Sequence, residues 1–181
     1  MANPRPLDFD PVAEARRQWE AHRWPAPAAT AAAISIMRAQ QIINLRADDA
    51  LRPLDLTFAR YEALVLLSFS REGSLPLGKM GERLMLHPTS VTNITDRLEH
   101  QGLVRRIAHP TDRRRTLAEI TPEGRRVVWE ATEIMGKIGM GLGELDERTL
   151  DGITELIRPL RIDAGDFPPD GDTPPAAGDP G

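Results

Sequence analysis

Residues 88–124 read PTSVTNITDRLEHQGLVRRIAHPTDRRRTLAEITPEG, and this stretch decides the fold. Its first part repeats apolar residues at the spacing of one helix face, at Val91, Ile94 and Leu98. Pro88 suits the first turn of that helix, and Gly102 suits its C-terminal stop. The pattern then changes to two strand-like runs, 103–107 and 116–120, on either side of a charged segment. The stretch therefore predicts a helix followed by a β-hairpin with a charged tip.

Two more helices are predicted immediately before this stretch. Residues 77–84 have the pattern of a short helix, and Leu86-His87-Pro88 is a tight connection to the next one. Further upstream, Thr57 can cap a helix that ends near Gly73. Its apolar residues cover so much of its surface that it must be largely buried. The predicted order is therefore helix, short helix, turn, helix and hairpin.

Three longer helices are predicted to flank this region. Thr30 can cap a helix over 31–49, and Thr121-Pro122 can start a long helix after the hairpin. Asp146 can cap a final helix, which Pro159 is expected to disturb. The apolar stripes of these helices exceed what one small domain can cover, so a partner must bury them. A homodimer is therefore predicted.

The two ends of the chain differ in composition from its body. The first 27 residues are proline-rich, but the run from Val12 to Trp24 lacks proline and predicts a short amphipathic helix. Residues 163–181 contain five Pro, four Gly and five Asp, which predicts a disordered tail. The predicted fold class is mainly α with a small β-hairpin wing. Its parts are an N-terminal extension over 1–27, a domain over 28–162 with a winged helix-turn-helix at about 54–121 and dimerisation helices at about 31–49 and 122–162, and the tail.

Charge is distributed unevenly along the chain, whose formal net charge is -4. Residues 97–126 hold eight arginines against four acidic residues, whereas residues 144–181 hold ten acidic residues against three arginines. The basic window coincides with the predicted helix and hairpin. Positive charge is therefore concentrated where a phosphate backbone could be met.

Short polar side chains on the helix that begins at Pro88 are of the kind that contacts base edges. A helix about 10 to 12 Å across fits the major groove of B-DNA, which is about 12 Å wide. The candidate DNA-binding residues on this helix are Pro88, Thr89, Ser90, Thr92, Asn93 and Arg97. At the hairpin tip, Arg113, Arg114 and Arg115 can reach phosphates or the narrow minor groove. The predicted partner is double-stranded DNA.

Some of the arginines have a second interpretation that stays open. Arg97 can contact a phosphate or form a structural ion pair. Arg105 and Arg106 point to opposite sides of a strand, so one of them can instead pair with Glu119 or another acidic residue. The alternative for the whole region is a winged helix that binds another protein in place of DNA.

Several classes of function lack the residues they need. Cysteine is absent, which excludes disulfides, thiolate metal sites and a cysteine nucleophile, and the four histidines lack the spacing of a metal site on one helix. No Gly-x-Ser-x-Gly, Walker or His-Glu-x-x-His motif occurs. We therefore expect no enzyme activity, no cofactor and no metal. The chain has neither an apolar run of about 18 residues nor a secretory signal pattern, so we expect a cytoplasmic protein with no membrane partner.

Over roughly residues 31–162 the chain resembles the MarR family of transcription regulators. The resemblance is carried by residues 91–99 with Gly102-Leu103-Val104, by residues 112–115 and by residues 120–124. It implies a dimer whose first and last helices interlock, with a recognition helix in the major groove and a wing in the minor groove. It also implies that Asp112 orients the wing and that Arg114 enters the groove. The function it implies is a repressor that binds a pseudo-palindromic operator and is released by a small ligand.

The N-terminal segment with Trp19 resembles the subgroup of this family that responds to urate and related metabolites. That subgroup has an acidic residue where Glu62 lies, but its recognition-helix arginine is replaced by Ile94 here. The resemblance therefore implies a small anionic or aromatic ligand near Trp19, Tyr61 and Glu62.

Overall fold

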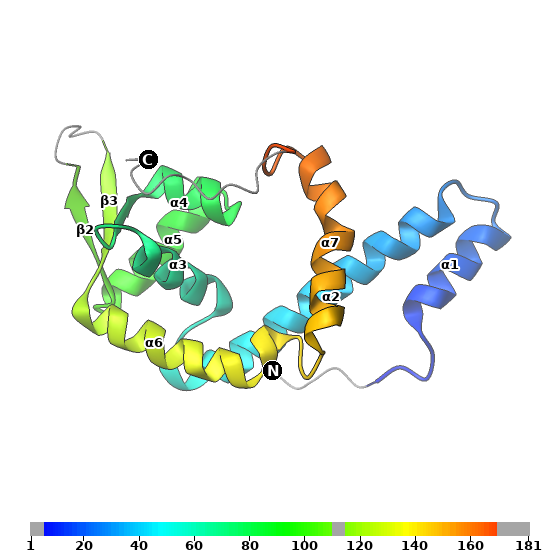
Figure 1. The fold of residues 1–181 in the computed structure, drawn as a ribbon, viewed down its shortest axis with the longest axis horizontal. Helices are drawn as coiled ribbons and strands as arrows, with labels where there is room; N and C mark the ends of the chain where they lie inside the picture. The colour runs from blue at the N-terminus through cyan, green and yellow to red at the C-terminus, as the bar shows by residue number, and fades with distance from the viewer. Residues whose placement is uncertain (1–5, 110–114, 170–181) are drawn as a thin grey trace.

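The fold is mainly helical, with one three-stranded antiparallel sheet of order β1-β3-β2, and it confirms the predicted fold class (Figure 1). The computed structural model describes residues 6–109 and 115–169. The elements are α1 (Pro11–Ala21), α2 (Pro27–Leu51), η1 (Arg52–Leu54), α3 (Phe58–Phe69), β1 (Ser74–Pro76), α4 (Leu77–Leu84), α5 (Pro88–His100), β2 (Val104–Ala108), β3 (Thr116–Ile120), α6 (Pro122–Lys137), η2 (Gly139–Gly141) and α7 (Glu147–Asp163).

Three of the predicted N-caps are confirmed. Thr57 Oγ1 accepts the backbone N–H of Arg60 at 3.4 Å and begins α3. Thr121 Oγ1 accepts that of Gly124 at 3.0 Å, and Asp146 accepts that of Thr149 at 2.7 Å. Each cap satisfies one of the N–H groups that a helix start leaves unpaired, so these boundaries follow from local sequence.

One predicted helix start is wrong. Thr30 does not cap α2, because the helix begins at Pro27 after Ala26, and Thr30 Oγ1 donates to the Ala26 carbonyl from inside the helix. Proline supplies a preset φ at this start, so no side-chain cap is needed. Pro159 lies inside α7, which continues to Asp163, close to the predicted end of the helical region at 162. A proline inside a helix removes one hydrogen bond and crowds the carbonyl four residues earlier, which weakens the helix there.

The core lies between α3, α5, α6 and the sheet, in the lobe that also contains α4 (Figure 1). Its largest fully buried side chains include Leu64, Leu67, Met80 and Leu98. Strand β1 was not predicted from the sequence: its three residues pair with Leu117–Glu119 of β3. Strand β2 pairs with the other side of β3, from Val104 opposite Ile120 to Ala108 opposite Thr116. The sheet therefore joins the base of the hairpin to the connection between α3 and α4.

Helices α1, α2 and α7 extend beyond this lobe (Figure 1). Helix α1 packs on α2 at the end of the molecule opposite the sheet. The η2 turn between α6 and α7 is tied to α2, because Arg46 Nη1 donates to the Gly141 carbonyl at 3.0 Å. Residues 164–169 follow α7 directly, and there Asp166 accepts a hydrogen bond from Arg161 at 2.7 Å. Across residues 6–109 and 115–169, no helix combines the length and apolar character needed to cross a membrane.

Candidate nucleic-acid interface

Helix α5 has one buried face and one polar exposed face. Val91, Thr95 and Leu98 are buried against the core. The predicted contact residues lie on the other side: Pro88, Thr89, Thr92, Asn93 and Arg97 are exposed, and Ser90 is half-buried. The structure therefore brings the sequence-predicted residues of α5 together on one face, with Ser90 at its edge.

The side chains on this exposed face are mostly free to bind an external partner. Within the described part of the chain, Thr89, Asn93 and Arg97 make no side-chain hydrogen bond or ion pair, whereas Thr92 Oγ1 donates to the Pro88 carbonyl at 3.0 Å. Thr92 can then only accept from a base, while the Asn93 amide can both donate and accept. Arg97 forms no ion pair with another described residue.

The helix start is held by a histidine. The His87 ring accepts the backbone N–H of Thr89 at 3.3 Å, and Pro88 has no N–H to satisfy. The first turn of α5, which carries Thr89, is therefore fixed by a side chain that the sequence analysis did not select.

Arg105 and Arg106 both form ion pairs within the chain. Arg105 pairs with Glu119 on the neighbouring strand. Arg106 pairs with Asp96 at 2.6 Å and with Glu99, both on α5, and its backbone N–H donates to Glu99 at 3.0 Å. The backbone and side-chain hydrogen bonds from Arg106 hold the pKa of Glu99 below its ordinary value. Arg106 therefore fixes the hairpin to α5, and its acidic partners were not identified from the sequence.

The hairpin tip lies largely outside the described residues. Asp112, Arg113 and Arg114 fall there, so their predicted roles stay predictions. The last described contact before the tip is the N–H of His109 donating to the carbonyl of Arg115 at 3.1 Å. Arg115 is exposed and immediately precedes β3.

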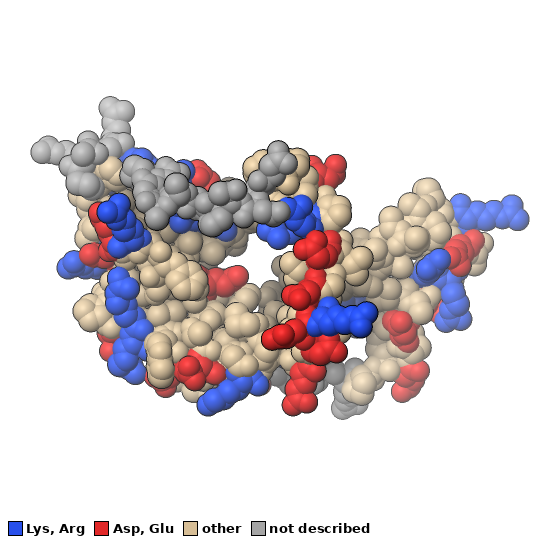
Figure 2. All heavy atoms as spheres, in the orientation of Figure 1, with Lys and Arg blue, Asp and Glu red and all other residues tan. Residues whose placement is uncertain are grey.

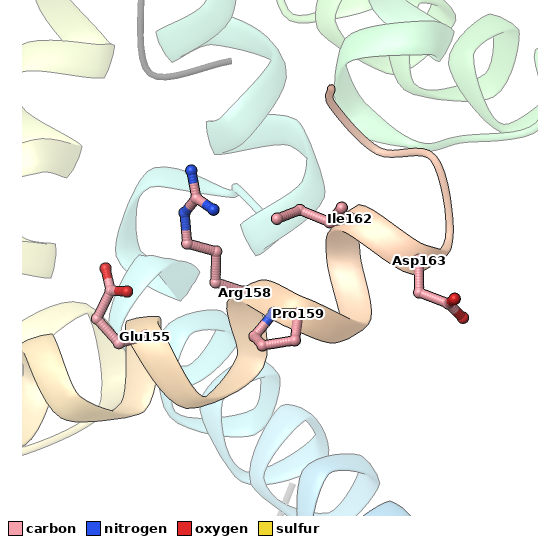
Figure 3. A pocket seen from close by; sticks show the side chains of 5 residues that line it. All are labelled: Glu155, Arg158, Pro159, Ile162 and Asp163. Carbon is pink, nitrogen blue, oxygen red and sulfur yellow. The ribbon is translucent and has the colours of Figure 1, made fainter. Parts of the chain in front are cut away.

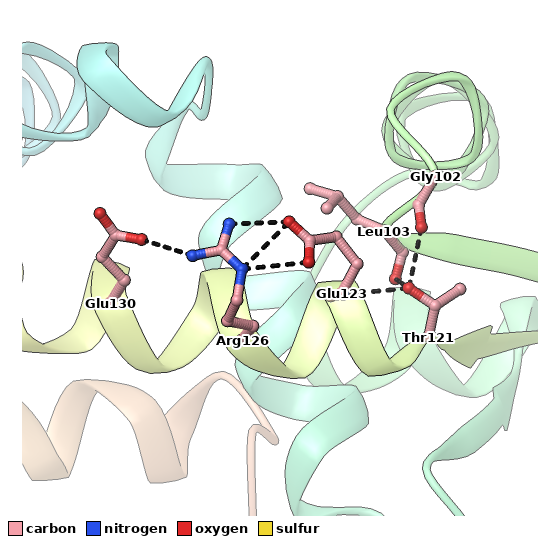
Figure 4. Close-up of polar contacts among 7 residues, drawn as sticks. Gly102, Leu103, Thr121, Glu123, Arg126 and Glu130 are labelled. Carbon is pink, nitrogen blue, oxygen red and sulfur yellow. Dashed lines mark hydrogen bonds and ion pairs between the residues drawn. The ribbon is translucent and has the colours of Figure 1, made fainter.

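The start of α6 holds the connection between α5 and the hairpin (Figure 4). Thr121 Oγ1 donates to the carbonyls of Gly102 and Leu103 at 2.8 and 3.1 Å while it accepts from Gly124. Gly124 is buried, and a Cβ at this position would overlap the Leu103 carbonyl oxygen and lie 2.8 Å from Cγ1 of Ile120. The contact that requires glycine joins residues 21 positions apart, so sequence reasoning missed it. On the exposed side of the same helix, Arg126 pairs with Glu123 and Glu130, which raises its pKa.

The predicted ligand residues do not form one site within a single chain. Tyr61 is buried in α3, and its hydroxyl lies 3.2 Å from Thr132 Oγ1. Glu62 next to it is only partly covered, and this burial raises the pKa of its carboxyl. Trp19 stacks edge-on against Trp24, with ring centroids 4.7 Å apart, in α1 at the other end of the molecule (Figure 1).

A separate hollow of about 480 Å³ lies along α7 (Figure 3). It is lined by Glu155, Arg158, Pro159, Ile162 and Asp163, all from one helix. None of the predicted binding residues borders it. Among residues 6–109 and 115–169, no three His, Asp or Glu side chains are grouped so that they could hold a metal ion.

Comparison with known proteins places this geometry in a family. The sequence model of the MarR family matches residues 56–116. The chain is 36% identical over 111 residues to YhbI of Bacillus subtilis, an uncharacterised helix-turn-helix transcriptional regulator, with 61% of this chain and 71% of that protein covered.

Solved structures agree with this assignment. Sco5413 of Streptomyces coelicolor, a MarR family transcriptional regulator, is 52% identical with a TM-score of 0.73, covering 77% of this chain and 97% of that chain. Sco3205 of the same organism, a MarR family regulator solved in complex with DNA, is 22% identical with a TM-score of 0.68, covering 95% of this chain and 98% of that chain, and it shares the fold. With its winged helix-turn-helix and these relatives, the chain belongs to the MarR family of transcriptional regulators.

Proposed function

We propose that this protein is a homodimeric repressor that binds a pseudo-palindromic DNA operator and is released by a small ligand. The observation that carries the proposal is the exposed face of α5, where Thr89, Asn93 and Arg97 have no hydrogen-bonding partner among the described residues. This face has the side chains for base and phosphate contacts, and its helix fits a major groove.

The homodimer is supported by apolar side chains that one chain leaves exposed. Helix α7 has no buried residue, yet Leu156 is 83% exposed and Ile153 and Leu160 are exposed beside it. Helix α2 exposes another set, Ile36, Met37, Ile42 and Leu45. Acidic side chains also run along α7 (Figure 2). A second copy that covers α2 and the apolar side of α7 would remove this surface from water and leave the acidic side exposed.

A two-fold dimer presents two equivalent copies of α5. The operator should then contain two inverted half-sites whose centres lie about 10 base pairs or a multiple of that apart. Selection of bound duplexes from a random pool tests this directly. An unsymmetrical motif with a single half-site would contradict the docking, and recovery of no motif would favour the alternative, a winged helix that binds another protein.

Asn93→Ala is expected to change which sequences are selected more than it changes affinity for random DNA. The Asn93 amide can form a bidentate contact with a base edge, whereas affinity for random DNA comes mainly from phosphate contacts. The selected motif and the affinity for an unrelated duplex should be measured together. Arg97→Ala is the matched comparison on the same face and should weaken both kinds of duplex about equally.

Arg114→Ala is expected to weaken operator binding about 5- to 150-fold, which is the effect of losing about 1 to 3 kcal/mol. The family resemblance gives this residue the minor-groove contact. Arg113→Ala should cost less and mainly reduce the salt dependence, by about 0.9 in the slope for one phosphate contact. Operator affinity against salt concentration measures both, after circular dichroism has shown that the variants are folded. A larger loss in Arg113→Ala, or equal losses in the two variants, would contradict this assignment of the two roles.

The ligand is proposed to be a small anionic or aromatic molecule bound near Tyr61 and Glu62, between the DNA-binding lobe and the dimer helices. Trp19 can join that site only if the second copy supplies it, because α1 lies far from α3 in one chain (Figure 1). A ligand can release the operator only if it binds more tightly to a dimer arrangement that does not fit DNA than to the arrangement that does. Ligand-induced release of operator DNA that is unchanged in Trp19→Ala and Glu62→Ala together would place the site elsewhere.

A further inference from the structure

Met85, in the connection between α4 and α5, has an unfavourable backbone conformation and an exposed side chain. Its backbone is left-handed, with φ 51° and ψ 42°. Its side chain is 74% exposed. In the protein alone, this methionine therefore has a conformational cost with little gain from burial.

The left-handed backbone is required by the way α4 ends. The N–H of Met85 donates to the Glu82 carbonyl at 3.4 Å, and the N–H of Leu86 donates to the Gly81 carbonyl at 2.9 Å. These bonds close the helix with a residue in the left-handed region, where glycine is the relaxed choice. The end of α5 has glycine in the equivalent place, Gly102 with φ 71°. Glycine at position 85 would therefore form the same turn at a lower cost.

The surroundings of Met85 indicate what its side chain can contact. It lies three residues before Pro88, the first residue of α5, and so beside the N-terminal end of the exposed face described above. Arg83 and His87, two positions away on either side, are exposed, and Arg83 has no ion pair among the described residues. An apolar side chain between basic or polar neighbours suits a DNA surface, where phosphates alternate with sugar C–H groups and thymine methyl groups. A docking site for a protein would need a wider apolar patch.

We propose that Met85 is a DNA-contact residue whose thioether packs on the apolar C–H surface of the operator, formed by deoxyribose or a thymine methyl, next to the first turn of α5. This inference rests on the proposed operator binding. The contact with DNA would then compensate for the backbone strain at position 85, which folding alone does not. The flexible, unbranched methionine side chain adapts well to such an irregular surface.

Three variants test this inference on the full-length protein and the operator recovered from selection. Met85→Gly should raise the midpoint of thermal unfolding by about 3 °C, because the backbone strain is relieved. It should also weaken operator binding roughly 5-fold, the effect of losing one apolar base or sugar contact. Met85→Leu keeps the apolar contact and should bind within about two-fold of the wild type.

Met140→Gly is the matched control. Met140 is also a methionine in the left-handed region, with φ 54°, and is 41% exposed, but it lies in η2, outside the helix-turn-helix. Its replacement should raise the unfolding midpoint in the same way and leave operator affinity unchanged, with the dimer verified by sedimentation. An operator with deoxyuridine in place of thymidine then separates the two contact surfaces, because only a methyl contact loses affinity.

Operator binding by Met85→Gly that equals or exceeds the wild type would overturn the inference. So would an equal loss of affinity in Met140→Gly, since the effect would then follow from backbone relaxation alone. Failure of the wild type to bind any duplex is a different result, because it removes the proposed function itself.

Discussion

Gly124→Ala is expected to lower the free energy of unfolding by about 3 kcal/mol, at the upper end of what overpacking usually costs. Gly124 is buried in the first turn of α6, and a methyl group there would overlap the Leu103 carbonyl oxygen. That carbonyl also accepts hydrogen bonds from the backbone N–H and the hydroxyl of Thr121 (Figure 4). The methyl can be accommodated only if the α5–β2 connection and α6 move apart. Urea unfolding followed by circular dichroism measures the change.

The same helix contains a matched control for this substitution. Gly136 is exposed in the last turns of α6, and a Cβ there would have no neighbour within 4 Å. Gly136→Ala should therefore raise the free energy of unfolding, by up to about 1 kcal/mol, because alanine is the better helix former. Shifts of the same sign in the two variants would show that close approach is not the reason for glycine at position 124.

Leu156→Glu is expected to weaken dimerisation about 100-fold. Leu156 is 83% exposed in one chain, so the substitution removes no packing from the folded subunit. In the proposed dimer the same position is covered by the second copy, where a carboxylate would lose its contact with water. Sedimentation velocity across micromolar concentrations measures the shift to monomer.

Operator affinity should fall when the dimer dissociates. One recognition helix alone loses the high effective concentration that the second half-site provides, which predicts a further loss of about 100-fold in operator affinity. Phe69→Glu is the control, because Phe69 is also 83% exposed but lies at the end of α3, outside the proposed interface. A Leu156→Glu protein that remained dimeric, or a Phe69→Glu protein that became monomeric, would contradict the proposed interface.

Much of the fold is determined by signals that act over a few residues. Thr57, Thr121 and Asp146 each cap a helix through an N–H three positions further on. The short helix Leu77–Leu84 has the boundaries expected from its pattern, and the change from helical to strand-like spacing near Leu103 marks the hairpin. The polar face of α5 follows in the same way, because its apolar residues leave only one side for the core. These features depend on neighbours in the sequence, so the sequence alone was sufficient.

Other features were decided only when distant segments packed together. The acidic partners of Arg106 are Asp96 and Glu99, whereas Glu119 pairs with Arg105, and spacing along the chain does not distinguish these choices. Strand β1 forms because its three residues pair with the free edge of β3. Three residues are too few for a periodic pattern, so the sequence did not predict it.

The glycine at position 124 shows the physical reason for this division. A cap or an apolar repeat is a property of one segment and can be recognised from its residues. The requirement for glycine comes from a carbonyl 21 positions earlier that approaches the backbone of α6 after the hairpin has formed. The sequence by itself determined the winged helix and the face that it presents, and the tertiary structure decided which side chains hold that face in place, because those contacts depend on distances set by packing.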